Sequence, residues 1–258
     1  MRGEGGGGAV PLVSLRGVSK AFMSGTIALE NVDLDIRGGE LLTLLGPSGC
    51  GKSTVLRIVA GLTASSAGTV QWRGQPSLGF VFQEPTLAPW SNIYDNVWLP
   101  LRLRGVSRAD AKARVNEALA SVDLTGFERA FPRELSGGMK MRASIARALV
   151  LNPAVLLMDE PFAALDEITR AKLNDDILRL RSQTGATIVF VTHSVYESVY
   201  LSTRIVVMAP RPGRMVAEIE VDALAVRNEE FRLSKYYADR TRETSAALEQ
   251  AMGGAKCA

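Results

Sequence analysis

The sequence has few cysteines, no long apolar run and no block of basic residues. Two cysteines, Cys50 and Cys257, are present in 258 residues, which is too few for a disulfide framework and is typical of reduced thiols in a cytosolic protein. No stretch approaches the roughly 18 apolar residues of a membrane-spanning helix, and even residues 148–158 are interrupted by Asn152 and Pro153. The formal net charge is only +3, so nucleic acid is not an expected partner.

Apolar residues make up 47% of the chain, enough to form a full core in one large domain or two fused subdomains. The glycine-rich residues 1–11 have no apolar segment of signal-peptide type, and we expect a disordered leader there. Residues 12–225 then carry the patterns of a folded domain. The tail 226–258 has a helical pattern and is expected to become disordered after residue 253.

Apolar runs without alternation indicate buried strands at residues 41–45, 79–82, 155–158 and 187–192. A helical pattern follows the first run as far as Leu62, and another covers residues 170–181. This alternation predicts an α/β fold with a mostly parallel sheet. Residues 12–36 read as short strands with turns, and residues 84–150 as an inserted helical subdomain, in which Ser107 and Asp110 form a capping box.

The run at 41–45 leads directly into a glycine-rich segment that matches the phosphate-loop pattern at every fixed position. Its residues are Gly46, Pro47, Ser48, Gly49, Cys50, Gly51, Lys52 and Ser53. Glycines let backbone N–H groups turn toward phosphate oxygens, and the N-terminus of the following helix attracts the same anion. Lys52 can neutralise the β- and γ-phosphates, and the Ser53 hydroxyl is placed for Mg²⁺. The sequence therefore predicts ATP with Mg²⁺ as ligands.

Two acids, Asp159 and Glu160, end the buried strand at 155–158. Ligands of open α/β sheets bind at the carboxyl ends of the strands. We expect Asp159 to hold Mg²⁺ and Glu160 to act as the general base for the attacking water. Without the phosphate loop, the same two residues would read equally well as solvated acids.

Two further polar residues follow expected strands. His193 comes after residues 187–192, where an imidazole can donate to the γ-phosphate and help to hold the attacking water. Gln83 comes after residues 79–82 and offers an amide to Mg²⁺ or water. A lone histidine is more often structural, and an isolated glutamine has no meaning by itself, so both assignments depend on the phosphate loop.

A Ser-Gly-Gly turn at Ser136, Gly137 and Gly138 opens a helical pattern before the acidic strand. Glycines leave the N–H groups open, and the helix dipole adds to a second anion site. Together with the phosphate loop, Gln83, the acidic strand, Ala164-Leu165-Asp166 and His193, in that order, this turn resembles the ATP-binding cassette family over residues 12 to about 219. Met139 stands where many members carry glutamine.

The resemblance implies the P-loop NTPase fold with an N-terminal antiparallel β subdomain and the inserted helical subdomain. It places Phe22 against adenine, Thr54 with the phosphate loop, and Asp166 in a loop at a dimer interface. Ser136, Gly137 and Gly138 would bind the γ-phosphate held by a second copy of the chain. The family therefore implies ATP hydrolysis by a dimer with two ATP and two Mg²⁺ between the copies.

Residues 83–97 and 210–214 resemble importer ATPases of the nitrate, sulfonate and taurine group, and relatives that serve pyrimidine-type vitamin precursors share much of this pattern. That resemblance implies two integral-membrane permease subunits and, indirectly, a periplasmic or lipid-anchored solute-binding protein, at the cytoplasmic face of a bacterial inner membrane. A separate-subunit exporter is the alternative. The solute is not readable from the chain. Trp90 and Trp98, with their neighbours Ile93, Tyr94, Val97 and Leu99, either pack the helical core or line a groove for a permease helix.

Overall fold

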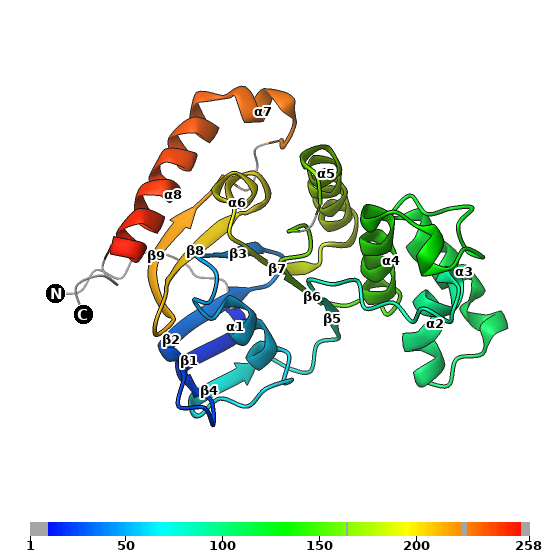
Figure 1. Cartoon of the computed structure of the whole chain (residues 1–258), viewed down its shortest axis with the longest axis horizontal. Coiled ribbons are helices and arrows are strands. Elements are labelled where there is room, and N and C mark those ends of the chain that lie inside the picture. The colour runs from blue at the N-terminus through cyan, green and yellow to red at the C-terminus, as the bar shows by residue number, and fades with distance from the viewer. Residues whose placement is uncertain (1–9, 164, 223–225, 254–258) are drawn as a thin grey trace.

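The computed structural model describes residues 10–163, 165–222 and 226–253. The expected leader therefore falls almost entirely outside the described residues, as do Ala164 and the end of the tail at 254–258. A large sheet lies at the centre, a small sheet packs on one side of it, and a group of helices extends from the opposite end (Figure 1).

The large sheet has the strand order β5-β6-β7-β3-β8-β9. Its strands are β3 (Leu41–Leu45), β5 (Leu78–Val81), β6 (Val155–Asp159), β7 (Thr187–Thr192), β8 (Arg204–Ala209) and β9 (Arg214–Glu220). All neighbours pair in parallel except β8 and β9, which form an antiparallel hairpin at the edge. The mostly parallel sheet predicted from the apolar runs is confirmed.

The central strands are apolar throughout because both faces of the sheet are covered. Leu156 and Met158 of β6 join the core beneath the helices, whereas Val155 and Leu157 join the core beneath the small sheet. Alternate residues of one strand thus belong to two different hydrophobic layers. This double burial explains why these strands show no polar alternation in the sequence.

The small sheet is antiparallel, with the order β2-β1-β4. It consists of β1 (Pro11–Ala21), β2 (Ile27–Arg37) and β4 (Ala67–Trp72). The predicted N-terminal antiparallel subdomain is confirmed, and its first two strands are longer than the short strands expected. Helix α1 (Lys52–Val59) lies between the two sheets and ends before Leu62, which is outside the helix and 58% exposed, contrary to the sequence expectation.

Three helices form the part of the molecule at the right of Figure 1, together with the 3-10 turn η1 (Pro132–Glu134). They are α2 (Ile93–Leu103), α3 (Arg108–Ala120) and α4 (Gly137–Leu149). Ser107 caps α3 by accepting a hydrogen bond from the N–H of Asp110, as the sequence indicated. These helices fall within residues 84–150, where the helical subdomain was expected.

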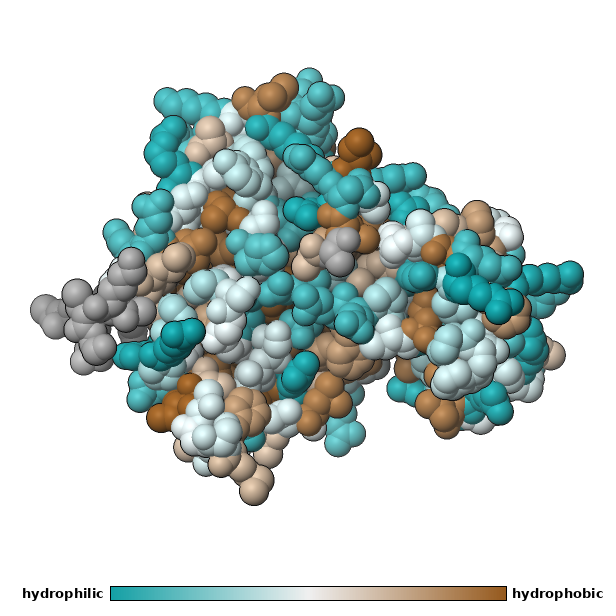
Figure 2. Space-filling model, in the orientation of Figure 1, coloured by the Kyte–Doolittle hydropathy of each residue, from teal (hydrophilic) through white to brown (hydrophobic). Residues whose placement is uncertain are grey.

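The other face of the large sheet carries α5 (Glu167–Thr184) and α6 (Val195–Leu201). The chain ends in α7 (Glu229–Leu233) and α8 (Lys235–Gly253), and α8 lies along β8 and β9. Hydrophobic residues are scattered over the visible face without one broad patch (Figure 2). Among the described residues, no helix combines the length and the hydropathy of a membrane span.

Candidate active site

The glycine-rich segment leaves β3 and enters α1 as predicted. Gly51 caps α1 with φ +93°, and a Cβ there would lie 2.6 Å from Leu29 Cδ2. Gly46 is equally confined, since its Cβ would meet Cys50 Sγ at 2.6 Å. Only glycine suits Gly51, because the left-handed backbone and the close approach of β2 both exclude a side chain. The shape of the loop is thus fixed by packing within the protein.

Lys52 is buried, with 3% of its side chain exposed. Its Nζ donates to Gly46 O at 2.8 Å and to Pro47 O at 3.0 Å, and lies 3.3 Å from Glu160 Oε1. A buried ammonium needs such partners, because desolvation of an unpaired charge is costly. The lysine is therefore held inside the loop by carbonyl oxygens and by the carboxylate of the proposed general base.

Ser53 and Asp159 meet directly at the carboxyl ends of β3 and β6. The Ser53 hydroxyl donates to Asp159 Oδ1 at 2.7 Å. Burial raises the pKa of Asp159, while the Ser53 hydrogen bond and the charge of Arg57 oppose that rise. A hydroxyl and a carboxylate in contact are hard oxygen ligands, the kind that Mg²⁺ prefers. These two residues are the ones that could hold the metal.

Glu160 connects Lys52 to His193. Its Oε2 lies 3.1 Å from His193 Nδ1, and its backbone has φ +44°. The Glu160 N–H donates to Val191 O at 3.1 Å, so the turn is anchored to β7 despite its left-handed conformation. Non-glycine residues in this region occur where the surroundings impose the conformation, often at active sites. The structure thus brings together Lys52, Ser53, Asp159, Glu160 and His193.

Gln83 lies just beyond β5, next to the acidic end of β6, and its side chain is exposed. The segment after it is anchored by Arg147 of α4, which donates to Pro85 O at 3.0 Å and to Thr86 O at 2.8 Å. The buried Asn96 also holds this segment through bonds to Ala88 and Ser91. Neither anchor was identified from the sequence, since a single arginine or asparagine in a helical pattern reads as ordinary.

The signature turn (Ser136, Gly137 and Gly138) opens α4 in the helical part, away from α1 (Figure 1). Ser136 caps the helix by accepting from the N–H of Met139 at 3.3 Å. A Cβ on Gly138 would lie 2.7 Å from Thr169 Cγ2 of α5. Gly138 is therefore also required by helix packing, a reason that the sequence did not reveal. The half-buried Met139 packs on the core.

Asp166 and Phe22 lie in exposed positions. Asp166 caps α5 by accepting bonds from the N–H and the hydroxyl of Thr169, and these hydrogen bonds lower its pKa. Phe22 is 45% exposed at the turn between β1 and β2, beneath the ammonium of Lys20. The exposed ring lies near the start of β2, the strand whose Leu29 packs against Gly51 of the phosphate loop. A ring in this position can stack on a planar ligand.

Comparison with known proteins agrees with this geometry. Residues 29–163 match the family model described as ABC transporter. The chain belongs to this family. A solved dimeric ATP-binding cassette bound to ADP and inorganic phosphate superposes with a TM-score of 0.74 at 32% identity, covering 82% of this chain and 100% of that one.

Two curated relatives are similar over most of their length. The aliphatic sulfonates import ATP-binding protein of Pseudomonas syringae is 47% identical over 81% of this chain and 86% of its own. The taurine import ATP-binding protein of Rhizobium johnstonii is 45% identical over 76% of this chain and 77% of its own. The chain is accordingly an ATP-binding ABC ATPase, as the phosphate loop and the signature turn predicted.

The apolar segment of this ABC protein after Gln83 divides into core and surface. Ile93, Tyr94 and Val97 are buried in the core of the helical part, and Trp98 packs on that core while its Nε1 donates to Val106 O. Core packing is therefore the role of these four residues. Trp90, in contrast, is 81% exposed.

A groove of about 360 Å³ runs between β5 and the helices α2 and α4. Leu99 lies in its wall, which leaves its proposed contact with a permease helix a prediction. The sequence did not single out the other members. They include Phe80, Phe82, Leu103 and Arg147. This groove adjoins the segment that carries Gln83 at its start.

The β8–β9 turn packs against the phosphate loop and the start of β2. Gly213 N donates to Ala28 O at 3.0 Å, and a Cβ on Gly213 would lie 2.2 Å from Cys50 O. The peptide bond between Arg211 and Pro212 is cis. Residues 210–214 therefore contribute a structural support to the nucleotide site, which their sequence pattern alone did not indicate.

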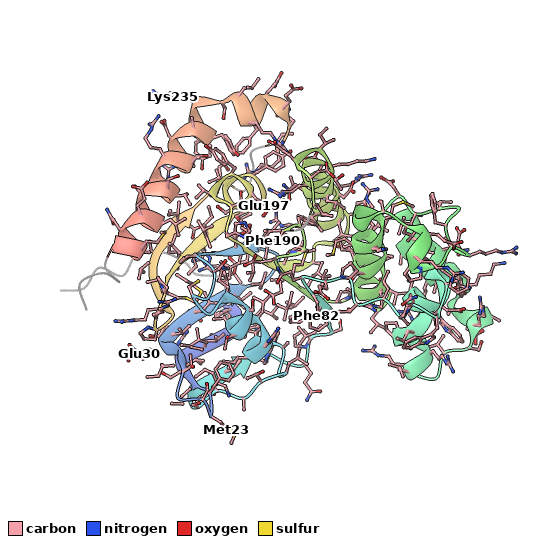
Figure 3. All side chains as sticks on the ribbon, in the orientation of Figure 1. Met23, Glu30, Phe82, Phe190, Glu197 and Lys235 are labelled. Carbon is pink, nitrogen blue, oxygen red and sulfur yellow. The ribbon has the colours of Figure 1, made fainter. Side chains whose placement is uncertain are left out.

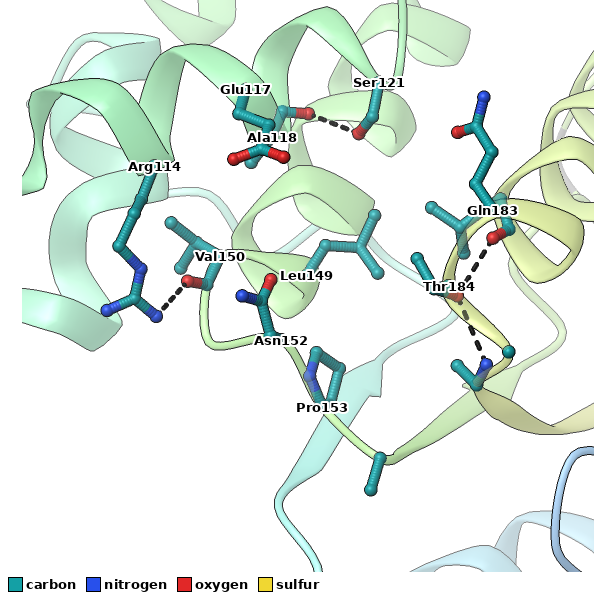
Figure 4. Close-up of a pocket in the computed structure, with 14 residues that line it drawn as sticks. Arg114, Glu117, Ala118, Ser121, Leu149, Val150, Asn152, Pro153, Gln183 and Thr184 are labelled. Atoms are coloured by element: carbon teal, nitrogen blue, oxygen red, sulfur yellow. Dashed lines mark hydrogen bonds between the residues drawn. The ribbon is translucent and has the colours of Figure 1, made fainter.

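A separate hollow of about 590 Å³ lies between α3, the loop after α4 and the end of α5 (Figure 4). Its wall includes Pro153 and Ala154, just before β6, and Ala186, just before β7. It is thus at the amino ends of the parallel strands, whereas the phosphate loop, Asp159 and His193 are at their carboxyl ends. The hollow is not part of the nucleotide site.

Proposed function

We propose that this chain is the ATP-hydrolysing subunit of a membrane importer for a small solute, active as a dimer that encloses two ATP. The observation that supports the proposal is a set of contacts at the carboxyl ends of the parallel strands. Lys52 and His193 both contact Glu160, and Ser53 donates a hydrogen bond to the adjacent Asp159. The signature turn lies on another part and is free to serve the nucleotide of a second copy. Because the phosphate loop and the signature turn lie apart on one chain, they can bind the same nucleotide only when they come from two copies in a dimer.

Each residue of the site has a distinct task. Lys52 leaves its carbonyl partners and Glu160 to bind the β- and γ-phosphates, which supply the same negative charge. Once Lys52 has moved, Glu160 is free to accept a proton from the attacking water as general base. His193, in contact with Glu160, holds this carboxylate and the γ-phosphate in one geometry. Mg²⁺, held by Ser53, Asp159 and Gln83, would neutralise charge on the phosphates.

The remaining contacts of the nucleotide complete the site. The phosphate-loop backbone, Thr54 and the ring of Phe22 would bind the near face of ATP. Ser136, Gly137 and Gly138 of the second copy would bind the γ-phosphate from the far face, beside Asp166. Gly137, which is exposed, and Gly138 supply backbone N–H groups at a helix start, where an anion is favoured.

Import, rather than export, is supported by the two relatives named for the import of sulfonates and taurine. Two permease subunits would provide the membrane span, and the groove beside β5 together with Trp90 would receive their cytoplasmic helices. A periplasmic or lipid-anchored binding protein would then select the solute, so that this chain lies at the cytoplasmic face of a bacterial inner membrane. A separate-subunit exporter is the second candidate, and ligand screening with the purified complex distinguishes the two.

The Glu160→Gln variant tests the proposed function. We expect it to lower ATP hydrolysis at least 100-fold, since general bases contribute about 10²- to 10⁴-fold, and to form a dimer in ATP but not in ADP. Size-exclusion chromatography with light scattering measures the dimer. Lys52→Ala is the control and should bind no ATP. Hydrolysis at the unmodified rate by Glu160→Gln would disprove the role of the base, and a monomer in ATP would disprove the sandwich.

A further inference from the structure

A buried polar cluster lies between α5 and α6, next to the residues that flank His193 in the chain. Glu197 of α6 is only 7% exposed, and Asn174 of α5 is 6% exposed. Figure 3 labels Glu197 on α6, the helix that follows the strand β7 with Phe190. Carboxyl and amide groups are rarely buried so deeply without a specific role. The roles assigned above to the nucleotide site use neither residue.

One side of the cluster holds the residue that precedes His193. The Thr192 hydroxyl donates to Glu197 Oε2, and the Ser194 N–H donates back to the Thr192 hydroxyl at 3.0 Å. Both chain neighbours of His193 are thus connected to Glu197. A shift of this carboxyl would therefore move the backbone that carries the imidazole.

The other side holds the loop that ends at Asp166. Arg170 of α5 donates from Nη2 to Leu165 O at 2.9 Å, immediately before Asp166. Arg170 and Asn174 are four residues apart and therefore share one face of α5. Burial raises the pKa of Glu197, whereas Thr192, the charge of Arg170 and the amide of Asn174 act in the opposite direction. Arg170 and Glu197 thus act on each other electrostatically.

The cluster leaves bonding capacity unused. Arg170 Nε, Asn174 Oδ1 and Glu197 Oε1 are all buried without a hydrogen-bond partner among residues 10–163, 165–222 and 226–253. No ion pair within 4.0 Å joins Arg170 to Glu197 in this part of the chain, although one has a free donor and the other a free acceptor. Unpaired buried groups of this kind call for an explanation, because most buried donors and acceptors in proteins are paired.

We propose that Arg170 and Glu197 are positioning residues that connect the Asp166 loop to His193 within each subunit. This inference rests on the proposed function, in which the Asp166 loop meets the second copy. When the second copy binds against this loop, the loop moves. Arg170 moves with it through the hydrogen bond to Leu165 O, and Arg170 Nε then forms a hydrogen bond with Glu197 Oε1. Through Thr192, the closed pair then holds His193 in its position on the γ-phosphate. Hydrolysis in one site would thereby depend on the arrival of the partner.

The test compares Arg170→Met, Glu197→Gln and the double variant in the full chain. Lys172→Met, on the exposed face of the same helix, is the matched control. We expect each single variant to lower kcat at least 10-fold while the KM for ATP stays within 3-fold. The double variant should match the single variants, because two residues that act as one unit are not additive. The control should hydrolyse ATP like the unmodified chain.

Thermal unfolding and nucleotide binding give the folded fraction of each variant. If Arg170→Met does not fold, Arg170→Lys replaces it, since lysine keeps the charge and lacks the forked donors. The proposal is overturned if kcat stays within 2-fold, if kcat falls only in proportion to the folded fraction, or if the losses multiply in the double variant. Failure of ATP-dependent dimerisation by Glu160→Gln would instead overturn the proposed function, independently of these rates.

Discussion

Gly138 shows how one residue serves both packing and ligand access. Its N–H lies in the first turn of α4, where the helix dipole favours an anion, and its Cα faces the methyl group of Thr169 across the α4–α5 contact. Two explanations for a glycine here, access to its N–H and a close helix approach, both predict that Gly138→Ala is harmful, but only the second predicts that a smaller side chain at position 169 restores function.

Gly138→Ala should abolish ATP-dependent dimerisation, because the added Cβ would lie 2.7 Å from Thr169 Cγ2 and push α4 away from α5. Thr169→Ser removes that methyl group and keeps the hydroxyl that bonds Asp166. The double variant Gly138→Ala/Thr169→Ser should therefore recover most of the dimer, as measured by light scattering in the Glu160→Gln background. Thr169→Ser alone is the control. If the double variant stays monomeric, access of phosphate to the N–H, and not packing, is what requires the glycine.

At the scale of elements, the pair α4 and α5 is joined by a buried salt bridge. Arg142 Nη2 lies 2.7 Å from Asp176 Oδ2, and the two side chains are 10% and 7% exposed. Burial raises the pKa of Asp176, and the charges of Arg142 and Arg179 oppose that rise. The signature turn at the start of α4 and the Asp166 loop at the start of α5 are thus carried by helices that are connected internally.

Arg142→Met should lower the free energy of unfolding by about 3 kcal/mol, because it leaves Asp176 buried without its main partner. The measurement is urea unfolding at pH 7. Because the charge of Arg142 lowers the pKa of Asp176, its loss raises that pKa further in the folded variant. The variant then gains more from protonation than the unmodified chain does, so the deficit should shrink as the pH falls from 7 toward 5. Arg179→Met, which removes a half-exposed partner, should cost about 1 kcal/mol or less.

Arg142→Met/Asp176→Asn completes this comparison. The neutral amide needs no counter-charge, so the double variant should be more stable than Arg142→Met alone. A double variant that is less stable than Arg142→Met alone would show that the two helices are held by packing and not by the ion pair.

The elements that could be predicted from the sequence are those whose pattern is local. The strand 41–45 is apolar because both faces of the large sheet are covered, and Ser107 caps α3 through a neighbour three residues away. The assembly of Lys52, Ser53, Asp159, Glu160 and His193 also follows from a local rule, since all lie at the carboxyl ends of neighbouring parallel strands.

The features that could not be predicted depend on contacts between distant segments. Gly213 is required by the backbone of Cys50, Arg147 by the carbonyls of Pro85 and Thr86, and Arg170 by Leu165 O. None of these partners is marked by periodicity or motif. The end of α1 before Leu62 was missed for a related reason: an apolar residue at helical spacing looks the same whether it is buried in the helix or exposed beyond it.

At the scale of the whole molecule, the groove beside β5 and the exposed Trp90 form the surface that we propose for a permease. Leu103 is 79% exposed in the wall of this groove. Leu103→Glu and Trp90→Ala should leave ATP binding and basal hydrolysis unchanged, because exposed substitutions of this kind change stability by about 0.5 kcal/mol or less. Co-purification with the permease subunits should fall at least 10-fold for each variant.

Leu233→Glu is the matched control for this surface, since Leu233 of α7 is 81% exposed and lies far along the chain from the groove. It should assemble with the permease normally. Unchanged assembly and transport-coupled hydrolysis in Leu103→Glu and Trp90→Ala would reject this surface as the permease site.

The contact between Lys52 and Glu160 makes a carboxylate of the protein a competitor of the nucleotide for the same ammonium. Phosphate and carboxylate both seek the same buried ammonium, so part of the favourable interaction with ATP replaces a bond that the protein already has. By thermodynamic linkage, a change that weakens this pair but leaves the contacts of Lys52 with ATP unchanged strengthens ATP binding by the same amount. The Glu160→Gln substitution therefore has two effects. It removes the general base needed for ATP hydrolysis, and it frees Lys52 from its carboxylate partner so that the lysine can bind ATP.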